Sequence, residues 1–176
     1  MGLAESTLSI KLRKDNFVVN ESNKEAFETI FSSKNEDPAT RNPIFLFGGH
    51  GVGKTHLLQA YGHFVEENCA GASVLYVTGE HFINDVISAI RSGKGQAIEE
   101  LREKYRTTDY LLIDDIDFLL GKETSMCEMA FTIKDTVLKD KMVVVSSHKD
   151  FTSDTNCDED FRAVFCGWTK VEMRRE

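Results

Sequence analysis

A glycine-rich segment that ends in lysine and threonine is the first place in this sequence where chemistry is expected. Residues 48–55 read Gly-Gly-His-Gly-Val-Gly-Lys-Thr, which matches the phosphate-binding pattern G-x-x-x-x-G-K-[ST]. In this pattern the glycines let backbone N–H groups point at phosphate oxygens, and the start of the following helix adds its positive dipole end. We therefore expect Lys54 to reach the β- and γ-phosphates and Thr55 to hold Mg²⁺.

The flanking residues supply the strand and the helix that such a loop needs. Residues 44–47 form a short apolar run typical of a buried strand, and residues 56–61 favour a helix. His50 is interpreted as solvent-facing, and His56 as a side chain that packs the first helical turn. The predicted nucleotide contacts of this unit are Gly49, Gly51, Val52, Gly53, Lys54, Thr55 and His56.

Two acids follow a second buried run. Residues 111–113 are Leu-Leu-Ile and precede Asp114 and Asp115, so both carboxylates stand at the carboxyl end of a strand, where open α/β sheets bind ligands. We expect Asp114 to hold Mg²⁺ directly or through water, and Asp115 to orient or deprotonate an attacking water. Taken alone, this pattern is also typical of a strand that ends in a turn. Asp117 is interpreted as a solvated acid.

Ser146 and Ser147 end a later apolar run. Two interpretations stay open for them. One serine contacts the γ-phosphate or the attacking water, or both hydroxyls only cap the turn that follows.

The rest of the chain alternates apolar strands with amphipathic helices. Continuous apolar strands that alternate with helices indicate an α/β fold with a parallel sheet covered on both faces. Residues 129, 133, 137 and 138 are expected to face inward from their helix. Strands are expected at 8–12, 44–47, 74–77, 110–113, 142–145 and 168–173, and helices at 24–33, 56–70, 82–91, 98–106, 123–139 and 158–163.

Composition restricts the function classes. The chain has 176 residues, of which 41% are hydrophobic, enough for one domain with a real core. We divide it into a mobile N-terminal segment, 1–16, and one nucleotide-binding domain, 17–176. The net charge of −8 argues against broad binding of duplex DNA, which needs a basic face. No apolar run is long enough to predict a membrane span, and none suggests a signal peptide.

The four cysteines, Cys69, Cys127, Cys157 and Cys166, have no C-x-x-C spacing. The sequence therefore suggests neither a cysteine zinc site nor a redox dithiol. Free thiols are the default in a reducing compartment, so we expect a cytoplasmic protein.

Several of these segments resemble the AAA+ ATPase domain of the bacterial replication initiator DnaA. Residues 16–23, 42–49, 51–57, 75–77 and 111–116 carry the resemblance, which covers about residues 15 to 173. It implies an α/β P-loop NTPase fold of AAA+ type, a three-layer αβα arrangement with a five-stranded parallel sheet.

The same resemblance assigns roles outside the phosphate loop. It implies that Phe17, Val18 and Val19 pack near the adenine. It also implies that the helices between Phe82 and Arg106 form an initiator-specific insertion, which in the family helps to bind single-stranded origin DNA.

The sequence departs from the family pattern in three places. His148 stands where the family carries Asp after the sensor-1 serine. Val164 occupies the arginine-finger position, and Arg162, two residues away, is not expected to replace the finger. The sequence given ends at Glu176, so we expect the small helical lid and the duplex-DNA-binding domain to be absent.

We therefore predict a module that binds ATP or ADP with Mg²⁺ and is linked to DNA replication initiation or its regulation. An arginine finger contributes about 10³–10⁵ in rate, so we expect at most weak hydrolysis by the isolated chain. The alternatives are a non-catalytic regulator that caps a full-length initiator filament, a helicase-loader-like ATPase, and a degenerate paralogue.

The expected partners follow from this prediction. They are the nucleotide and either a full-length DnaA or a second copy of the chain through AAA+ faces. Arg91 and Lys94 leave single-stranded DNA open as a further partner. We expect no specific duplex DNA and no membrane.

Overall fold

The predicted apolar runs form a single parallel sheet. The computed structural model describes residues 8–33 and 42–175. The strands are β1 (Ile44–Phe47), β2 (Val74–Thr78), β3 (Tyr110–Asp114), β4 (Met142–Ser147) and β5 (Thr169–Glu172). Their order is β2-β3-β4-β1-β5, and every neighbouring pair is parallel. This arrangement confirms the expected α/β class with five parallel strands.

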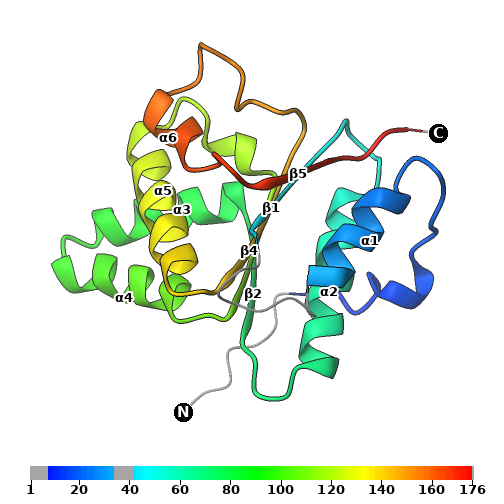
Figure 1. Ribbon diagram of the computed structural model, residues 1–176. Coiled ribbons are helices and arrows are strands. Elements are labelled where there is room, and N and C mark those ends of the chain that lie inside the picture. The colour runs from blue at the N-terminus through cyan, green and yellow to red at the C-terminus, as the bar shows by residue number, and fades with distance from the viewer. Residues whose placement is uncertain (1–7, 34–41, 176) are drawn as a thin grey trace.

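Helices cover both faces of the sheet, and α1 and α2 lie on the face opposite α3, α4, α5 and α6 (Figure 1). Alternate strand residues enter the two layers, because successive side chains of a strand point to opposite faces. The helices are α1 (Lys24–Ser32), α2 (Lys54–Asn68), α3 (Gly79–Arg91), α4 (Gly95–Arg106), α5 (Glu123–Leu138) and α6 (Glu159–Ala163), with short 3₁₀ turns η1 (Lys14–Asn16) and η3 (Ile116–Leu119).

Each face of the sheet has its own hydrophobic core. Leu112 and Val144 pack with residues of α1 and α2, whereas Leu111, Val143 and Val145 pack with residues of α3, α5 and α6. All five of these strand side chains are fully buried. The continuous apolar runs read from the sequence are therefore explained by burial on both faces.

The prediction of a strand at residues 8–12 is wrong. Residues 9–12 form a turn, and the buried Leu8 packs beside Gly62 of α2. The Ser9 N–H donates to Gln59 Oε1 at 2.7 Å, so a side chain of α2, and not a neighbouring strand, satisfies this backbone. Residues 1–7, part of the segment expected to be mobile, lie outside the described residues.

One inward prediction for α5 also fails. Met129 and Ile133 are buried as expected, but Leu138, the last residue of the helix, is 82% exposed. At about 100° per residue, Leu138 lies on the face of α5 opposite Met129 and in line with Phe131, which is 58% exposed. The neighbouring Val137 still packs against the core, so the error was to assign two adjacent residues to one face of the helix.

Candidate functional site

The glycine loop lies between β1 and α2, as expected. Gly48 directly follows β1 and lies against the end of β5. A Cβ on Gly48 would stand 2.1 Å from the Met173 carbonyl oxygen. Gly53 caps α2 with φ of 99°, a left-handed conformation that glycine adopts without strain. These two positions need glycine for the path of the backbone, and they bring Lys54 to the first position of the helix.

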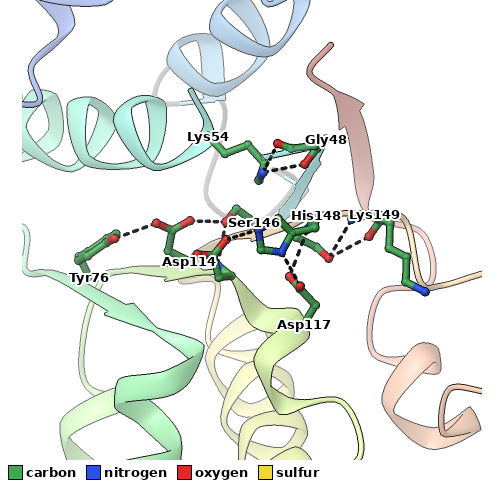
Figure 2. A network of polar contacts seen from close by, with 11 residues as sticks. Gly48, Lys54, Tyr76, Asp114, Asp117, Ser146, His148 and Lys149 are labelled. Atoms are coloured by element: carbon green, nitrogen blue, oxygen red, sulfur yellow. Dashed lines mark hydrogen bonds and ion pairs between the residues drawn. The ribbon is translucent and has the colours of Figure 1, made fainter. Parts of the chain in front are cut away.

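Lys54 points back over the loop and not toward open solvent (Figure 2). Its side chain is almost fully buried, and Nζ donates to the carbonyl oxygens of Gly48 and Gly49 at 2.6 and 2.8 Å. Burial lowers the pKa of the Lys54 ammonium, and the nearby charges of Asp115 and Asp114 oppose that shift. A cation held in this position can bind an anion without first having to be ordered.

His56 joins the N-terminal segment to α2. Its Nε2 donates to the Arg13 carbonyl oxygen at 3.0 Å and lies 2.9 Å from Asn16 Oδ1. Its ring also meets Phe17 edge-on, with the ring centroids 5.1 Å apart. These contacts agree with the interpretation of His56 as a packing residue, and they fix Phe17 beside the glycine loop.

The expected adenine residues form an exposed apolar edge next to this loop. The Phe17 ring stacks on Phe27 and comes within 3.5 Å of the position that a Cβ on Gly53 would occupy. Val18 and Val19 follow it with 78% and 44% of their surface exposed. Aliphatic side chains this exposed gain free energy when a flat apolar group covers them.

Asp114 ends β3 as a buried carboxylate with two hydroxyl partners. Oδ2 accepts a hydrogen bond from the Tyr76 hydroxyl at 2.8 Å, and Oδ1 accepts one from Ser146 Oγ (Figure 2). Only 1% of Asp114 is exposed. Burial, and after it the Asp114 charge, raises the pKa of Tyr76 well above its ordinary range, so the tyrosine stays protonated and donates.

Asp115 leaves the strand in a different direction. Its backbone is left-handed, with φ of 50° and ψ of 52°, and its N–H donates to Ser146 Oγ at 2.9 Å. The carboxylate is partly exposed, and burial followed by the Asp114 charge raises its pKa. The sharp turn explains how two consecutive acids come to lie in different environments.

Asp117 is not the solvated acid that the sequence suggested. Its Oδ1 accepts from the His148 backbone N–H at 3.1 Å, and its Oδ2 lies 2.5 Å from His148 Nδ1. Although burial by itself would raise the pKa of Asp117, these hydrogen bonds from His148 outweigh it and lower the pKa.

His148 also faces two other groups of the site. Its Nε2 lies 3.7 Å from Asp115 Oδ1, and its ring lies 3.7 Å from the ring of His50, centroid to centroid. His50 is exposed as expected, but its ring also contacts His148 at a tilt of 38°. Sequence reasoning missed this group because residues 50, 115 and 148 become neighbours only through the order of the strands.

Each of the two interpretations given for Ser146 and Ser147 applies to one of these serines. Ser146 Oγ contacts Asp114 and the backbone of Asp115, so it belongs to the site. Ser147 Oγ donates to the Lys149 carbonyl oxygen at 2.8 Å and caps the turn after β4.

The two positions near the expected arginine-finger box differ in burial. Val164 is buried against the α5–α6 layer. Arg162 is partly exposed, and its guanidinium donates through Nε to the Cys157 carbonyl oxygen at 3.1 Å. All four cysteines are free, as expected. In residues 8–33 and 42–175, no helix is long and apolar enough to cross a membrane.

A cavity of about 700 Å³ lies apart from these groups. It is bounded by α5, α6 and the loop before α6, and its lining includes Met126, Cys157 and Phe161. None of the loop, aspartate or serine residues described above lines it. The polar network at the strand ends is therefore the candidate site.

Comparison with known proteins finds one family over nearly the whole chain. Residues 8–169 match the family described as the bacterial DnaA ATPase domain. The chromosomal replication initiator protein DnaA of Caldanaerobacter subterraneus subsp. tengcongensis is 39% identical over 160 residues. That match covers 91% of this chain and 35% of the relative, so the chain spans about a third of the relative's length.

Solved structures of similar proteins agree with this match. A structure of replication initiator DnaA bound to AMPPCP and single-stranded DNA is 30% identical with a TM-score of 0.88, over 97% of this chain and 52% of that one. Domain III of the Thermotoga maritima DnaA protein is 33% identical with a TM-score of 0.85, over 96% of this chain and 69% of that one.

Proposed function

Because the chain belongs to the bacterial DnaA ATPase-domain family and has that family's P-loop NTPase fold, we propose that it binds ATP or ADP with Mg²⁺ as a module of replication initiation or its regulation. The observation that carries this proposal is the buried Lys54 ammonium, held over the glycine loop and facing the buried carboxylate of Asp114. A similar protein has been solved with AMPPCP, which supports a nucleotide at the same loop here.

Each part of the nucleotide has a proposed partner. The backbone of Gly49, Gly51, Val52 and Gly53 surrounds the phosphates, and the Lys54 ammonium moves from the loop carbonyls to the β- and γ-phosphate oxygens. The adenine covers the exposed valines 18 and 19 and lies beside Phe17. Asp115 orients the attacking water.

Mg²⁺ fits the oxygen ligands that this site offers. Thr55 presents a hydroxyl from the first turn of α2, and Asp114 presents a carboxylate from the end of β3. Both Asp114 oxygens already accept hydrogen bonds from buried hydroxyls, which favours contact with the ion through water over a direct bond. When bound, Mg²⁺ neutralises charge on the phosphates.

We also propose a cellular location and binding partners for the chain. The free cysteines and the replication family support a cytoplasmic location. Other DnaA-family chains or further copies of this chain are the proposed protein partners. Single-stranded DNA is proposed as a ligand because a similar protein is bound to it, and α3 exposes Ile87 and Ile90 as apolar surface for bases.

Calorimetric titration with ATP and with ADP, both with Mg²⁺, tests the nucleotide site. Lys54→Ala removes charge-assisted hydrogen bonds worth about 1.5–3 kcal/mol, so we expect affinity to fall roughly tenfold to a hundredfold or more. Lys139→Ala is the control, since that lysine is exposed on the far end of α5 and pairs with Asp135. Equal affinity of the wild type and Lys54→Ala, with both folded by circular dichroism, would contradict the proposal.

A regulatory role is a second candidate, and the buried Val164 favours it. A chain without a finger arginine can accept a neighbour's finger but cannot offer one onward, so it would end a filament of full-length DnaA. Adding the chain to such filaments in the presence of ATP should shorten them in proportion to its concentration. No contact with full-length DnaA at micromolar concentration would count against this role.

A further inference from the structure

One mixed imidazole–carboxylate cluster stands beside the proposed nucleotide site. Asp115, Asp117 and His148 each offer a ligand atom, and these three atoms lie within 4.8 Å of one another. The cluster joins two stretches that are separate in sequence, the turn after β3 with Asp115 and Asp117 and the loop after β4 with His148. It differs from the Thr55–Asp114 pair because one of its donors is nitrogen.

Asp117 orients the imidazole of His148. In the neutral imidazole, the 2.5 Å contact between Asp117 Oδ2 and His148 Nδ1 favours the tautomer with the proton on Nδ1 and the lone pair on Nε2. The second bond, from the His148 backbone N–H to Asp117 Oδ1, fixes the carboxylate in turn. A carboxylate that holds the distal N–H of a histidine is the usual supporting arrangement of metal-binding histidines.

The second nitrogen of this imidazole lies near another oxygen donor. His148 Nε2 lies 3.7 Å from Asp115 Oδ1. Two ligands about 2.0–2.2 Å from one zinc-like ion stand roughly 3.3–3.6 Å apart in tetrahedral geometry. The observed separation is therefore within a few tenths of an ångström of that required by an ion placed between the two atoms.

The local charge also favours a cation. Three carboxylates, those of Asp114, Asp115 and Asp117, gather here, and Lys54 is the cation that acts on all three. Lys149, next to His148 in sequence, turns away to pair with Asp154. A divalent ion would offset the negative charge that remains.

We propose that Asp115 Oδ1 and His148 Nε2 bind a divalent transition-metal ion, that Asp117 is the orienting residue, and that water fills the remaining positions. Imidazole nitrogen suits Zn²⁺, Co²⁺ and Ni²⁺, whereas Mg²⁺ prefers oxygen ligands, so the site selects against Mg²⁺. The proposal rests on protein donors alone and does not depend on nucleotide binding.

Co²⁺ titration of the metal-free chain, without nucleotide and at neutral pH, tests this site. Visible d–d absorption should saturate at one equivalent, and no thiolate charge-transfer band should appear, because no cysteine takes part. His148→Asn and Asp115→Asn should each weaken Co²⁺ binding at least tenfold. Asp117→Asn should weaken it about 10–100-fold, the effect of losing a supporting carboxylate.

A matched histidine–aspartate pair elsewhere in the chain provides the control. His81 Nε2 lies 3.5 Å from Asp85 Oδ1 on the exposed side of α3, but among the described residues no second carboxylate holds that imidazole. His81→Asn should leave Co²⁺ affinity unchanged within about threefold. Circular dichroism of every variant separates lost ligands from lost folding, and the partly exposed Asp115 provides a second ligand variant if His148→Asn unfolds.

Three results would overturn the proposal. The first is that wild type and folded His148→Asn bind Co²⁺ with equal affinity. The second is that a thiolate charge-transfer band appears. The third is that His81→Asn loses as much Co²⁺ affinity as His148→Asn. Lys54→Ala distinguishes this proposal from the nucleotide proposal, since it should weaken nucleotide binding at least tenfold and retain Co²⁺ binding. Loss of Co²⁺ binding in folded Lys54→Ala would contradict the metal site alone.

Discussion

Asp114 and Asp115 are neighbours in sequence with opposite environments. Asp114 is buried, and two hydroxyl groups donate to it. Asp115 turns out of the strand with a left-handed backbone and faces Lys54 and His148. Two carboxylates whose surroundings differ in this way can hold different roles, one as a fixed charge and the other as a group that exchanges protons or ligands.

Tyr76→Phe tests the buried partner of Asp114. The substitution removes one donor from a buried carboxylate, and we expect the free energy of unfolding to fall by about 1.5–3 kcal/mol. Chemical denaturation measures this change. Tyr105→Phe is the comparison, because Tyr105 donates to Asp85, whose side chain is 24% exposed and can regain a water, and it should lose less. An equal or smaller loss at Tyr76 would contradict the account of Asp114.

Asp115→Asn tests how much the charged Asp115 carboxylate destabilises the folded protein at neutral pH. The pKa of Asp115 in the folded protein is raised above its ordinary 3.8, so its favourable contribution to stability is complete below that value and is lost as pH rises through the folded pKa. The neutral asparagine, which tolerates a left-handed backbone, should raise the free energy of unfolding at pH 7. The gain should disappear as pH falls.

Asp109→Asn is the control of opposite sign. Burial alone would raise the pKa of Asp109, but its hydrogen bonds with Lys141 and Ser73 outweigh burial and lower it. Its stabilising contribution is therefore present above the ordinary 3.8 and is lost as pH falls through the folded pKa. Asp109→Asn should lower stability at pH 7 and have little effect in acid. Urea unfolding in metal-free buffer across this pH range distinguishes the two variants.

The parallel order of the elements gathers the site. β3 and β4 pair directly, so their carboxyl ends bring Asp114 beside Ser146. β1 pairs with β4 on its other side, which places the glycine loop over the same edge. The start of α3 packs against the turn η3 that follows Asp115, so a helix without any predicted nucleotide contact supports the acids from outside.

Gly79→Ala tests that support. Gly79 is the first residue of α3, and a Cβ there would stand 2.5 Å from the Asp115 carbonyl oxygen. Backbone atoms cannot move aside cheaply, so we expect a loss of about 1–3 kcal/mol in the free energy of unfolding. Because Asp115 carries the clash, the variant should also weaken the proposed Co²⁺ site.

Gly95→Ala is the matched control, because Gly95 is the first residue of α4 and nothing lies within 4 Å of an added Cβ. We expect it to stabilise the protein by about 0.4–1 kcal/mol through the lower entropy of the unfolded chain. Thermal unfolding of both variants would contradict the steric account if they changed stability in the same direction.

At the scale of the whole molecule, the sheet separates two cores that serve different ends of the site. The core with α1 and α2 supports the glycine loop and Phe17, and the core with α3, α5 and α6 supports the acids and the buried Val164. The expected hydrolytic weakness concerns this second core, which buries Val164, the residue that the sequence comparison with the family aligns with the arginine finger.

We expect the isolated chain to release phosphate from ATP about 10³–10⁵ times more slowly than an assembly that has a finger arginine. Phosphate release at saturating ATP and Mg²⁺ measures the rate, and Lys54→Ala supplies the blank. Steady turnover by the wild type at rates of about 1 s⁻¹ or more, abolished in Lys54→Ala, would contradict this prediction.

Local patterns were sufficient for the loop, for the acids and for the fold class. The glycine loop and Asp114-Asp115 each lie within one strand and its following turn, so both motifs can be recognised from consecutive residues. Continuous apolar runs indicated a sheet buried on both faces. The two failures have different causes. The strand expected at 8–12 is replaced by a turn held by a side chain of α2, a neighbour that residues 8–12 do not specify. Leu138 lies on the exposed face of α5 with Phe131, which the helical period itself places there.

Only the tertiary structure decided how the acids are held. Tyr76 and Asp114 lie 38 residues apart, and Asp117 and His148 lie 31 apart. Each pair meets because β2, β3 and β4 are adjacent in the sheet, an order that no local pattern contains. The sequence by itself thus determined a phosphate loop with two acids. The strand order added the imidazole of His148, which with Asp115 forms the proposed second metal site.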